Sequence, residues 1–363
     1  MKTSRLAAYA LGVLAAAALI AGCSGGTQSS ALSPTSMTNA AHSGANPLHE
    51  RSALGAFVSV KQPGQAHPDH HKSWISPEAR KRHVRLLFVS DSGTDDVYIY
   101  SLPKVTLRGT LTGFSEPQGM CSDGAGNVYV ANTGTDQIYK LSRTGSIVAT
   151  YTDPDGYPVG CAVDPATGNL AASDIFGFYG AGQVLVWTSP SATPTVLSNP
   201  SQYFYYFLGY GPGSSLWVSG RNSYGTYMVS ACGSSSCSTV NLTGGSIDFP
   251  GAVQWDKVRG EWVLWDQLCG DTEAACSYPV SASGALGSPT TYKNYDGGGV
   301  CDMVQGAIAG DRLKFVIGSD YEYCGTASTS SGRWLYTAGG DPTAYATYSD
   351  PYAEPIGATV SSK

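Results

Sequence analysis

A repeated strand-turn-strand unit is the feature that most limits what this chain can fold into. Its clearest copy, Pro117–Gly145, reads PQGMCSDGAGNVYVANTGTDQIYKLSRTG. Three strand-like runs lie within it, at Met120–Ser122, Val128–Ala131 and Gln137–Leu141. Clusters of Gly, Asn and Asp separate the runs, and this pattern is typical of consecutive β-hairpins.

The unit recurs along the chain, about 40 to 55 residues apart, which is the spacing of one propeller blade per repeat. The other copies are Pro158–Asp174 (PVGCAVDPATGNLAASD), Pro250–Asp266 (PGAVQWDKVRGEWVLWD) and the less complete Phe207–Gly220 and Val304–Gly318. Their shared pattern, Pro-x-Gly-x-x-x-Asp followed by Gly-Asn-x-Tyr-Val-Ala-Asp/Asn, resembles the NHL-repeat family. The resemblance implies a β-propeller.

The first blade lacks its first strand. Leu86–Asp91 corresponds to the second strand of the next repeat, Val128–Asn132, and no first strand precedes it. The missing start occurs at the other end of the chain, where Pro355–Val360 (PIGATV) matches the beginning of the other repeats. We therefore predict an all-β fold over residues 85–363: a six-bladed β-propeller of four-stranded antiparallel blades, closed by the C-terminal strand completing blade one.

Residues 1–22 have the features of an export signal. Lys2 and Arg5 precede an apolar run, Leu6–Leu19, of about 14 residues, shorter than the roughly 20 that a membrane-spanning helix needs. The run ends in Leu19-Ile20-Ala21-Gly22-Cys23, which resembles a bacterial lipobox and implies lipidation of Cys23. A plain secretory signal with a chance cysteine is the alternative. We expect a lipid-anchored monomer on the cell envelope, exported to its periplasmic or extracellular face.

Residues 23–84 are rich in Ser, Gly, Ala and His without an apolar period, which is typical of a disordered tether. His67, His70 and His71 flank Asp69 there and indicate either a transition-metal site or solvated side chains. The basic stretch Arg80–Arg85 could contact anionic lipid or end the linker in solvent.

The cysteines indicate disulfides. There are nine, and removing Cys23 leaves eight in an exported chain, where pairing is the default. On the blade map, the expected pairs are Cys121–Cys161, Cys232–Cys237, Cys269–Cys276 and Cys301–Cys324. A cysteine-ligated metal lacks the paired CxxC spacing. Formal charge is −6 and no basic stripe crosses the repeats, so nucleic acid is not an expected partner.

Propeller ligands usually bind at the mouth of the central channel, which is lined by residues that enter each first strand or leave each second strand. The ligand-contacting residues predicted there are Glu116, Tyr157, Tyr206, Phe249, Trp265, Asp266 and Glu354. They predict a mouth with an acidic half and an aromatic half, where flat rings could stack on a sugar or peptide. The alternative for the aromatic residues is packing between blades.

The oxygen-bearing residues of this mouth suit a hard divalent cation such as Ca²⁺, which is the one cofactor that the sequence suggests. The candidate metal ligands are Asp91, Glu116, Asn132, Asp174 and Glu354. The alternative is that Asp91, Asn132 and Asp174 cap their own turns, as Asx side chains commonly do.

Histidine distribution limits the chemistry. All six histidines, the last of them His83, precede the repeats, whereas general acid–base and nucleophilic mechanisms most often use one. Similarity to propeller lyases of the streptogramin-lyase type therefore does not extend to their histidines. Glu116, Asn132 and Asp174 faintly resemble the cation site of the regucalcin/gluconolactonase-like family, but that family's Ser-x-Asp-Gly segment is missing.

Three functions follow as hypotheses. The first is a non-enzymatic envelope propeller that binds a protein, peptide or glycan through its channel mouth. The second is a divalent-cation-dependent, lactonase-like hydrolase at the same mouth. The third is a structural role as a spacer or assembly partner, without a small ligand.

Overall fold

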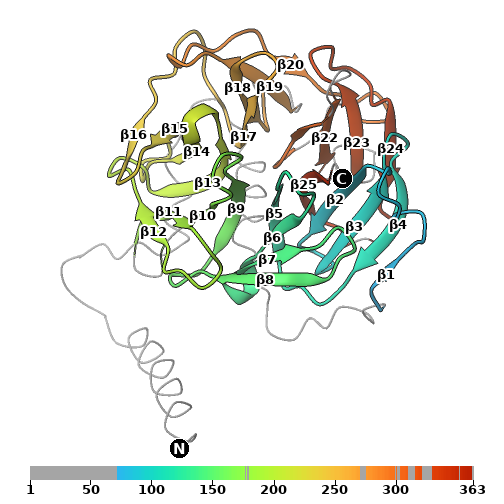
Figure 1. Ribbon diagram of the computed structural model, residues 1–363. Coiled ribbons are helices and arrows are strands. Elements are labelled where there is room, and N and C mark those ends of the chain that lie inside the picture. The colour runs from blue at the N-terminus through green and yellow to red at the C-terminus, as the bar shows by residue number, and fades with distance from the viewer. Residues whose placement is uncertain are drawn as a thin grey trace, which may run out of the picture. The chain divides into compact units, whose positions relative to one another are not determined.

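The strands of this computed structural model pair in antiparallel ladders that form one five-stranded sheet and five four-stranded sheets. The structure describes residues 72–361 apart from 176, 178–179, 270–274, 299, 301–302, 310–314, 321–328 and 351. Figure 1 shows the sheets arranged around a common centre. The predicted all-β propeller of antiparallel blades is thus confirmed.

The sheets are numbered here in chain order, and their strands are given from the centre outward. The first sheet contains β25 (Pro355–Ser361), β2 (Leu86–Asp91), β3 (Asp96–Ser101), β4 (Thr106–Leu111) and β1 (Trp74–Ile75). The second contains β5 (Pro117–Ser122), β6 (Val128–Asn132), β7 (Gln137–Leu141) and β8 (Ile147–Thr152). The third contains β9 (Pro158–Val163), β10 (Leu170–Asp174), β11 (Gln183–Trp187) and β12 (Thr195–Leu197).

The remaining three sheets repeat this order. The fourth contains β13 (Phe204–Tyr210), β14 (Leu216–Arg221), β15 (Tyr227–Cys232) and β16 (Cys237–Thr239). The fifth contains β17 (Pro250–Asp256), β18 (Glu261–Asp266), β19 (Cys276–Val280) and β20 (Thr290–Thr291). The sixth contains β21 (Ala307–Ala309), β22 (Phe315–Asp320), β23 (Ser330–Leu335) and β24 (Ala344–Thr347). Short 3₁₀ turns occur at η2 (Thr133–Thr135) and η3 (Pro212–Ser214).

The C-terminal strand closes the ring. β25 pairs with β2 from Leu86 opposite Ser361 to Asp91 opposite Pro355, as the sequence predicts. The innermost strands contact one another in the order β25, β5, β9, β13, β17, β21 and back to β25. Pairing the last strand with one of the first covers a sheet edge that would otherwise be open to other chains.

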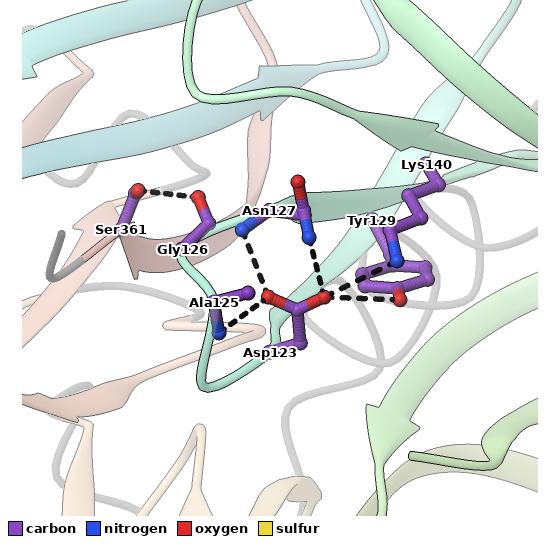
Figure 2. Close-up of polar contacts among 7 residues, drawn as sticks. All are labelled: Asp123, Ala125, Gly126, Asn127, Tyr129, Lys140 and Ser361. Carbon is purple, nitrogen blue, oxygen red and sulfur yellow. Dashed lines mark hydrogen bonds and ion pairs between the residues drawn. The ribbon is translucent and has the colours of Figure 1, made fainter.

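The turn of the clearest repeat, between β5 and β6, is organised by one carboxylate (Figure 2). Asp123 Oδ1 accepts the backbone N–H groups of Ala125 and Asn127, both at 2.9 Å. Its Oδ2 accepts Asn127 Nδ2 at 2.7 Å and lies 3.3 Å from Lys140 Nζ. Ser361 Oγ donates to the Gly126 carbonyl of the same turn at 2.6 Å, so the Asp-Gly-Ala-Gly-Asn signature also holds the end of the closing strand.

Buried serines link neighbouring sheets. Ser90 donates to the carbonyl of Gln118, Ser173 to that of Tyr206, and Ser219 to that of Gly251. Each serine lies in the second strand of its sheet and each acceptor in the first strand of the next. Aromatic packing adds to these bonds, since the Trp217 and Trp262 rings stack with centroids 4.6 Å apart. These two tryptophans, on β14 and β18, pack between the fourth and fifth sheets.

Residues 72–84, which the sequence predicts to be part of the tether, contribute to the propeller. Trp74 pairs with Thr110 and Ile75 with Gly109 on β4, which gives the first sheet its fifth strand. The Arg143 guanidinium donates to the carbonyls of Val84 and, at 3.1 Å, Lys81. The predicted boundary at residue 85 is therefore too late, because the paired backbone of β1 and these carbonyl contacts hold residues 74–84 against the sheets.

Three predicted disulfides are present. Cys121–Cys161 joins β5 to β9 with Cα atoms 5.6 Å apart, Cys232–Cys237 links β15 to β16, and Cys269–Cys276 closes a loop in the fifth sheet. The predicted Cys301–Cys324 pair lies outside the described residues. Disulfides persist in oxidising compartments, which indicates an extracellular or periplasmic protein. Within the described ranges, no helix has the length and apolar character needed to cross a bilayer.

Candidate ligand-binding site at the loop end of the sheets

The second strand of each sheet ends where the first begins, and we call this end of the sheets the loop end. Three predicted mouth residues at the ends of second strands have side chains that accept hydrogen bonds from backbone N–H groups. Asp91 Oδ1 accepts the N–H groups of Gly93, Thr94 and Glu354 at 2.9–3.1 Å. Asn132 Oδ1 accepts Ser115 N–H at 2.8 Å. Asp266 accepts three N–H groups, from Asp248, Phe249 and Leu268.

These bonds fix the lead-in to the first strand of the same sheet. The turn-capping alternative therefore holds for Asp91, whose oxygen bonds the N–H groups of its own turn. Burial raises the pKa of Asp91 to about 7, and the Glu354 charge adds to the rise although the backbone N–H groups oppose it. Burial also raises the pKa of Asp266, with three backbone hydrogen bonds acting against the shift.

Glu116 and Tyr157 are held at the loop end by the same kind of backbone hydrogen bond to an aspartate. Each precedes the proline that starts a first strand, and each has a left-handed backbone, with φ of 48° and 66°. Asp95 Oδ1 accepts Glu116 N–H at 2.8 Å, and Asp136 Oδ1 accepts Tyr157 N–H at 3.4 Å. Such non-glycine conformations persist only where neighbouring contacts enforce them. Both side chains are half-buried, so they still reach the surface that the sequence predicts.

The predicted aromatic half of the mouth is core. Tyr206, Phe249, Trp265 and Asp266 are all 0% exposed. The Tyr206 and Phe249 rings stack with centroids 5.9 Å apart, and the Trp265 ring is packed so closely on Gly306 that a Cβ there would lie 2.0 Å from Nε1. The expectation that these four side chains contact a ligand is corrected, since all four are buried; for the three aromatic residues, packing between blades is the alternative that the sequence left open.

The five predicted metal ligands do not converge. Among the described residues, no three or more His, Cys, Asp or Glu side chains are placed to hold a metal ion. Asp91 and Asn132 each use one side-chain oxygen to accept backbone N–H groups. Glu354 Oε2 lies 3.3 Å from Ser92 Oγ, within hydrogen-bond distance. The predicted grouping of Asp91, Glu116, Asn132, Asp174 and Glu354 as one Ca²⁺ site is therefore not found in the described structure.

Asp174, at the end of β10, belongs instead to a different group of carboxylates. Gln183 Nε2 donates to Asp155 Oδ2 and lies 3.5 Å from Asp174 Oδ2, so it bridges the two. Asp153 N–H donates to the backbone carbonyl of Asp136 at 2.9 Å. We call Asp136, Asp153, Asp155 and Asp174 the acidic cluster. Its members come from the β6–β7 turn, the β8–β9 loop and the end of β10, at the joint between the second and third sheets.

The acidic cluster grades from solvent to core. Asp136 is exposed and Asp155 half-buried, whereas Asp153 is 3% and Asp174 0% exposed. Asp153 Oδ1 accepts the N–H groups of Asp155 and Gly156 at 2.9 and 3.1 Å. Its Oδ2 and the Oδ1 of Asp174 are buried and have no hydrogen-bond partner within the described part of the chain. A buried polar atom left in this state costs about 1–3 kcal/mol.

In the described structure, no positively charged side chain is paired with the carboxyl groups of the acidic cluster. Burial, followed by the charges of Asp153 and Asp155, raises the pKa of Asp174 to about 9, against the opposing Gln183 hydrogen bond. Burial also raises the pKa of Asp153 to about 7. Asp174 therefore holds a proton at neutral pH. Such a group can release that proton when a positive charge arrives.

Sequence reasoning found Asp174 but not its neighbours. Asp153 and Asp155 lie in the segment Asp-Pro-Asp-Gly-Tyr-Pro, directly before a repeat, and this pair of aspartates is the sequence feature that could have indicated the cluster.

A separate groove of about 260 Å³ lies away from the acidic cluster, at the outer edge of the first two sheets. Its lining includes Trp74, Leu111, Phe114 and Ile147.

Comparison with known proteins bears on the fold alone. No family model matches the chain, and no curated protein matches it. A chain of a nidogen/laminin complex is 13% identical with a TM-score of 0.57, covering 77% of this chain and 99% of that one. A protein of unknown function from Bacteroides caccae is 11% identical with a TM-score of 0.53, covering 77% and 100%.

A virginiamycin B lyase from Staphylococcus aureus is 13% identical over 79% of this chain and 91% of that one, with a TM-score of 0.48. At such identities the first two likenesses show a shared architecture and no shared activity. By its strand pairing and its structural neighbours, the chain is an all-β propeller with antiparallel blades.

Proposed function

We propose that this chain is a six-bladed, NHL-like binding propeller, held on the bacterial cell envelope by a lipid on Cys23, that recognises a protein or peptide through the loop end of its second and third sheets. The lipobox-like residues ending at Cys23 and the disulfides support the location. The acidic cluster, with Tyr157 at the same joint, supports the recognition surface.

One observation carries the binding role. Asp153 and Asp174 bury oxygens that no described donor satisfies, and their pKa values are raised first by burial and then by the negative charges nearby. A folded protein retains such a group at a cost to its stability. A positively charged partner that reaches these oxygens would recover that free energy on binding, which supports a binding role for this joint.

The hydrolase alternative needs carboxylate and amide oxygens that converge on one cation. In the described structure Asn132, one of the residues it would use, gives its Oδ1 to Ser115 N–H and its Nδ2 to Thr135 at 2.6 Å. Recognition of a partner requires only a complementary surface, and the half-buried Tyr157 and Asp155 provide one. Binding is therefore the function that the geometry supports best.

Site-specific photocross-linking tests this proposal in the intact, anchored protein. A photoreactive phenylalanine derivative at Tyr157 is expected to yield a discrete cross-linked partner in cells. The matched position is Val258, 62% exposed in the turn between β17 and β18, at the opposite end of the sheets. Adducts from Tyr157 but not from Val258 support recognition at the loop end. Adducts of equal yield from both positions, or from Val258 alone, overturn it.

A further inference from the structure

The acidic cluster has a charge that the described structure does not balance. The ion pairs among the described side chains join Lys81 to Glu78, Lys140 to Asp123 and Arg259 to Glu261, and none includes a member of the cluster. The groups that raise the pKa of Asp174, after burial itself, are the carboxylates of Asp153, Asp155 and Asp136. Among the described residues, the polar side chain bonded to Asp174 is the neutral amide of Gln183.

From this arrangement we infer that the acidic cluster receives the guanidinium group of an arginine side chain on the bound protein or peptide. The inference rests on the proposed function and adds the chemistry of the partner. Its first support is the pair of buried, unpartnered oxygens, Asp153 Oδ2 and Asp174 Oδ1. Once both carboxyl groups are ionised, these oxygens are acceptors without donors, so a ligand that satisfies them must bring a positive charge or N–H or O–H groups.

The spacing of the carboxylates favours a guanidinium over a metal ion. Ca²⁺ needs six to eight oxygens at about 2.3–2.6 Å, and no three acidic side chains in the described ranges are so placed. A guanidinium spreads five N–H donors over a rigid fork and bonds carboxylates at about 2.7–2.9 Å. It can therefore bridge carboxylates that lie too far apart to share one small ion.

The burial gradient favours a long side chain. Asp136 is exposed, Asp155 half-buried and Asp174 fully buried. A charge carried on a flexible apolar stem can pass the outer carboxylates and reach the inner one while its stem packs on protein. Tyr157, whose N–H is bonded to Asp136, places an aromatic residue at the same joint, and aromatic faces attract guanidinium groups.

Binding of the guanidinium group should release a proton from Asp174. Because the pKa of Asp174 is raised to about 9 in the empty protein, Asp174 carries a proton at pH 7. A bound cation favours the ionised carboxylate, so the pKa falls and a proton leaves to solvent. Affinity for the arginine group should then increase as pH rises from about 7 towards 9.

Titration of the full-length protein with three blocked tripeptides, Ac-Gly-Arg-Gly-NH₂ and its lysine and citrulline analogues, tests the inference. Citrulline matches arginine in shape but has no charge. We expect the arginine peptide to bind at least about tenfold more tightly than the citrulline peptide, and to lose that advantage in Asp174→Asn and Asp155→Asn. Asp341→Asn removes an exposed carboxylate in the β23–β24 connection and should bind as the wild type does.

The outcomes separate this inference from the proposed function. Asp155 is half-buried, so its variant remains informative if the Asp174 variant does not fold. Equal affinity for arginine and citrulline peptides, or unchanged affinity in a folded Asp155→Asn protein, overturns the arginine inference. CaCl₂ that raises the melting temperature and competes with the peptide overturns it in favour of a metal site. If the arginine inference fails but Tyr157 still cross-links to a partner, the proposed binding role stands. If Tyr157 yields no specific cross-link, both the binding role and the arginine inference are overturned.

Discussion

Gln305 bonds to Met120 as a neighbouring strand would, with Oε1 accepting Met120 N–H at 2.9 Å and Nε2 donating to Met120 C=O at 2.7 Å. The same Oε1 accepts Ala358 N–H on β25 at 3.0 Å. One amide side chain, in the segment leading to β21, thus ties the sixth sheet to the innermost strands of the first and second. β21 has only three residues, so this side chain strengthens a joint where little strand pairing is available.

Replacing Gln305 with alanine should destabilise the fold by about 2–4 kcal/mol, because it leaves two buried N–H groups and a buried carbonyl without partners. Chemical denaturation measures the loss. Gln254→Ala is the matched control, since Gln254 bonds both backbone groups of Ile308 but both residues are half-buried. Water can replace its bonds, so a smaller loss is expected. Equal losses in the two variants would show that Gln305 has no special part in closing the ring.

The disulfides should differ in their effect on stability. Cys121–Cys161 closes a loop with a sequence separation of 40, whereas Cys232–Cys237 has a separation of 5. Loop-closure entropy then predicts a loss of about 4 kcal/mol for the double serine variant of the first pair and about 2 kcal/mol for the second. Denaturation midpoints of the two variants under oxidising conditions check this order. A larger loss for Cys232–Cys237 would contradict the account of how the second and third sheets are joined.

Stability should depend on pH through Asp91. Its folded pKa of about 7 lies above the ordinary value of 3.8, so the folded protein binds the proton more tightly than the unfolded chain. This stabilisation is complete below about pH 4 and is lost as pH rises through 7. Asp91→Asn keeps the capping oxygen, as Asn132 does in the next sheet, and removes the charge.

The Asp91→Asn variant should therefore match the wild type near pH 4 and exceed it at pH 8. We expect a gain of at least about 1.4 kcal/mol, which corresponds to a single pKa unit. Urea midpoints across this range provide the measurement. A variant that is less stable than the wild type at pH 8 would mean that the Asp91 charge itself holds the Glu354 lead-in.

The repeats made much of the fold predictable. Turns rich in Gly and Asp mark the ends of each predicted strand. The strand Gln137–Leu141 therefore has the predicted limits, and Val128–Asn132 is one residue longer than predicted. The closing strand was predictable because Pro355 begins the same pattern as Pro117 and Pro158. These features are local: a few adjacent residues specify each of them.

Features that depend on distant residues were not predictable in the same way. Trp74 and Ile75 pair with β4, but two residues are too few to show a strand period. The aromatic residues before Pro158 and Pro250 have equivalent positions, yet Tyr157 is half-buried while Phe249 is core, because packing from neighbouring sheets decides exposure. The acidic cluster depends on three separate segments that only the joint between two sheets brings together.

The carboxyl group of Asp174 offers the most direct test of the central claim, which is that this buried group is protonated in the free protein and ionises when a cation binds at the loop end. Carbon-13 NMR titration of the aspartate carboxyls, assigned with Asp174→Asn, measures its apparent pKa in the full-length protein. We predict a pKa far above 4, about 9, which falls when the arginine tripeptide is added. A pKa near 4 in the free protein, or one that the peptide leaves unchanged, would contradict it.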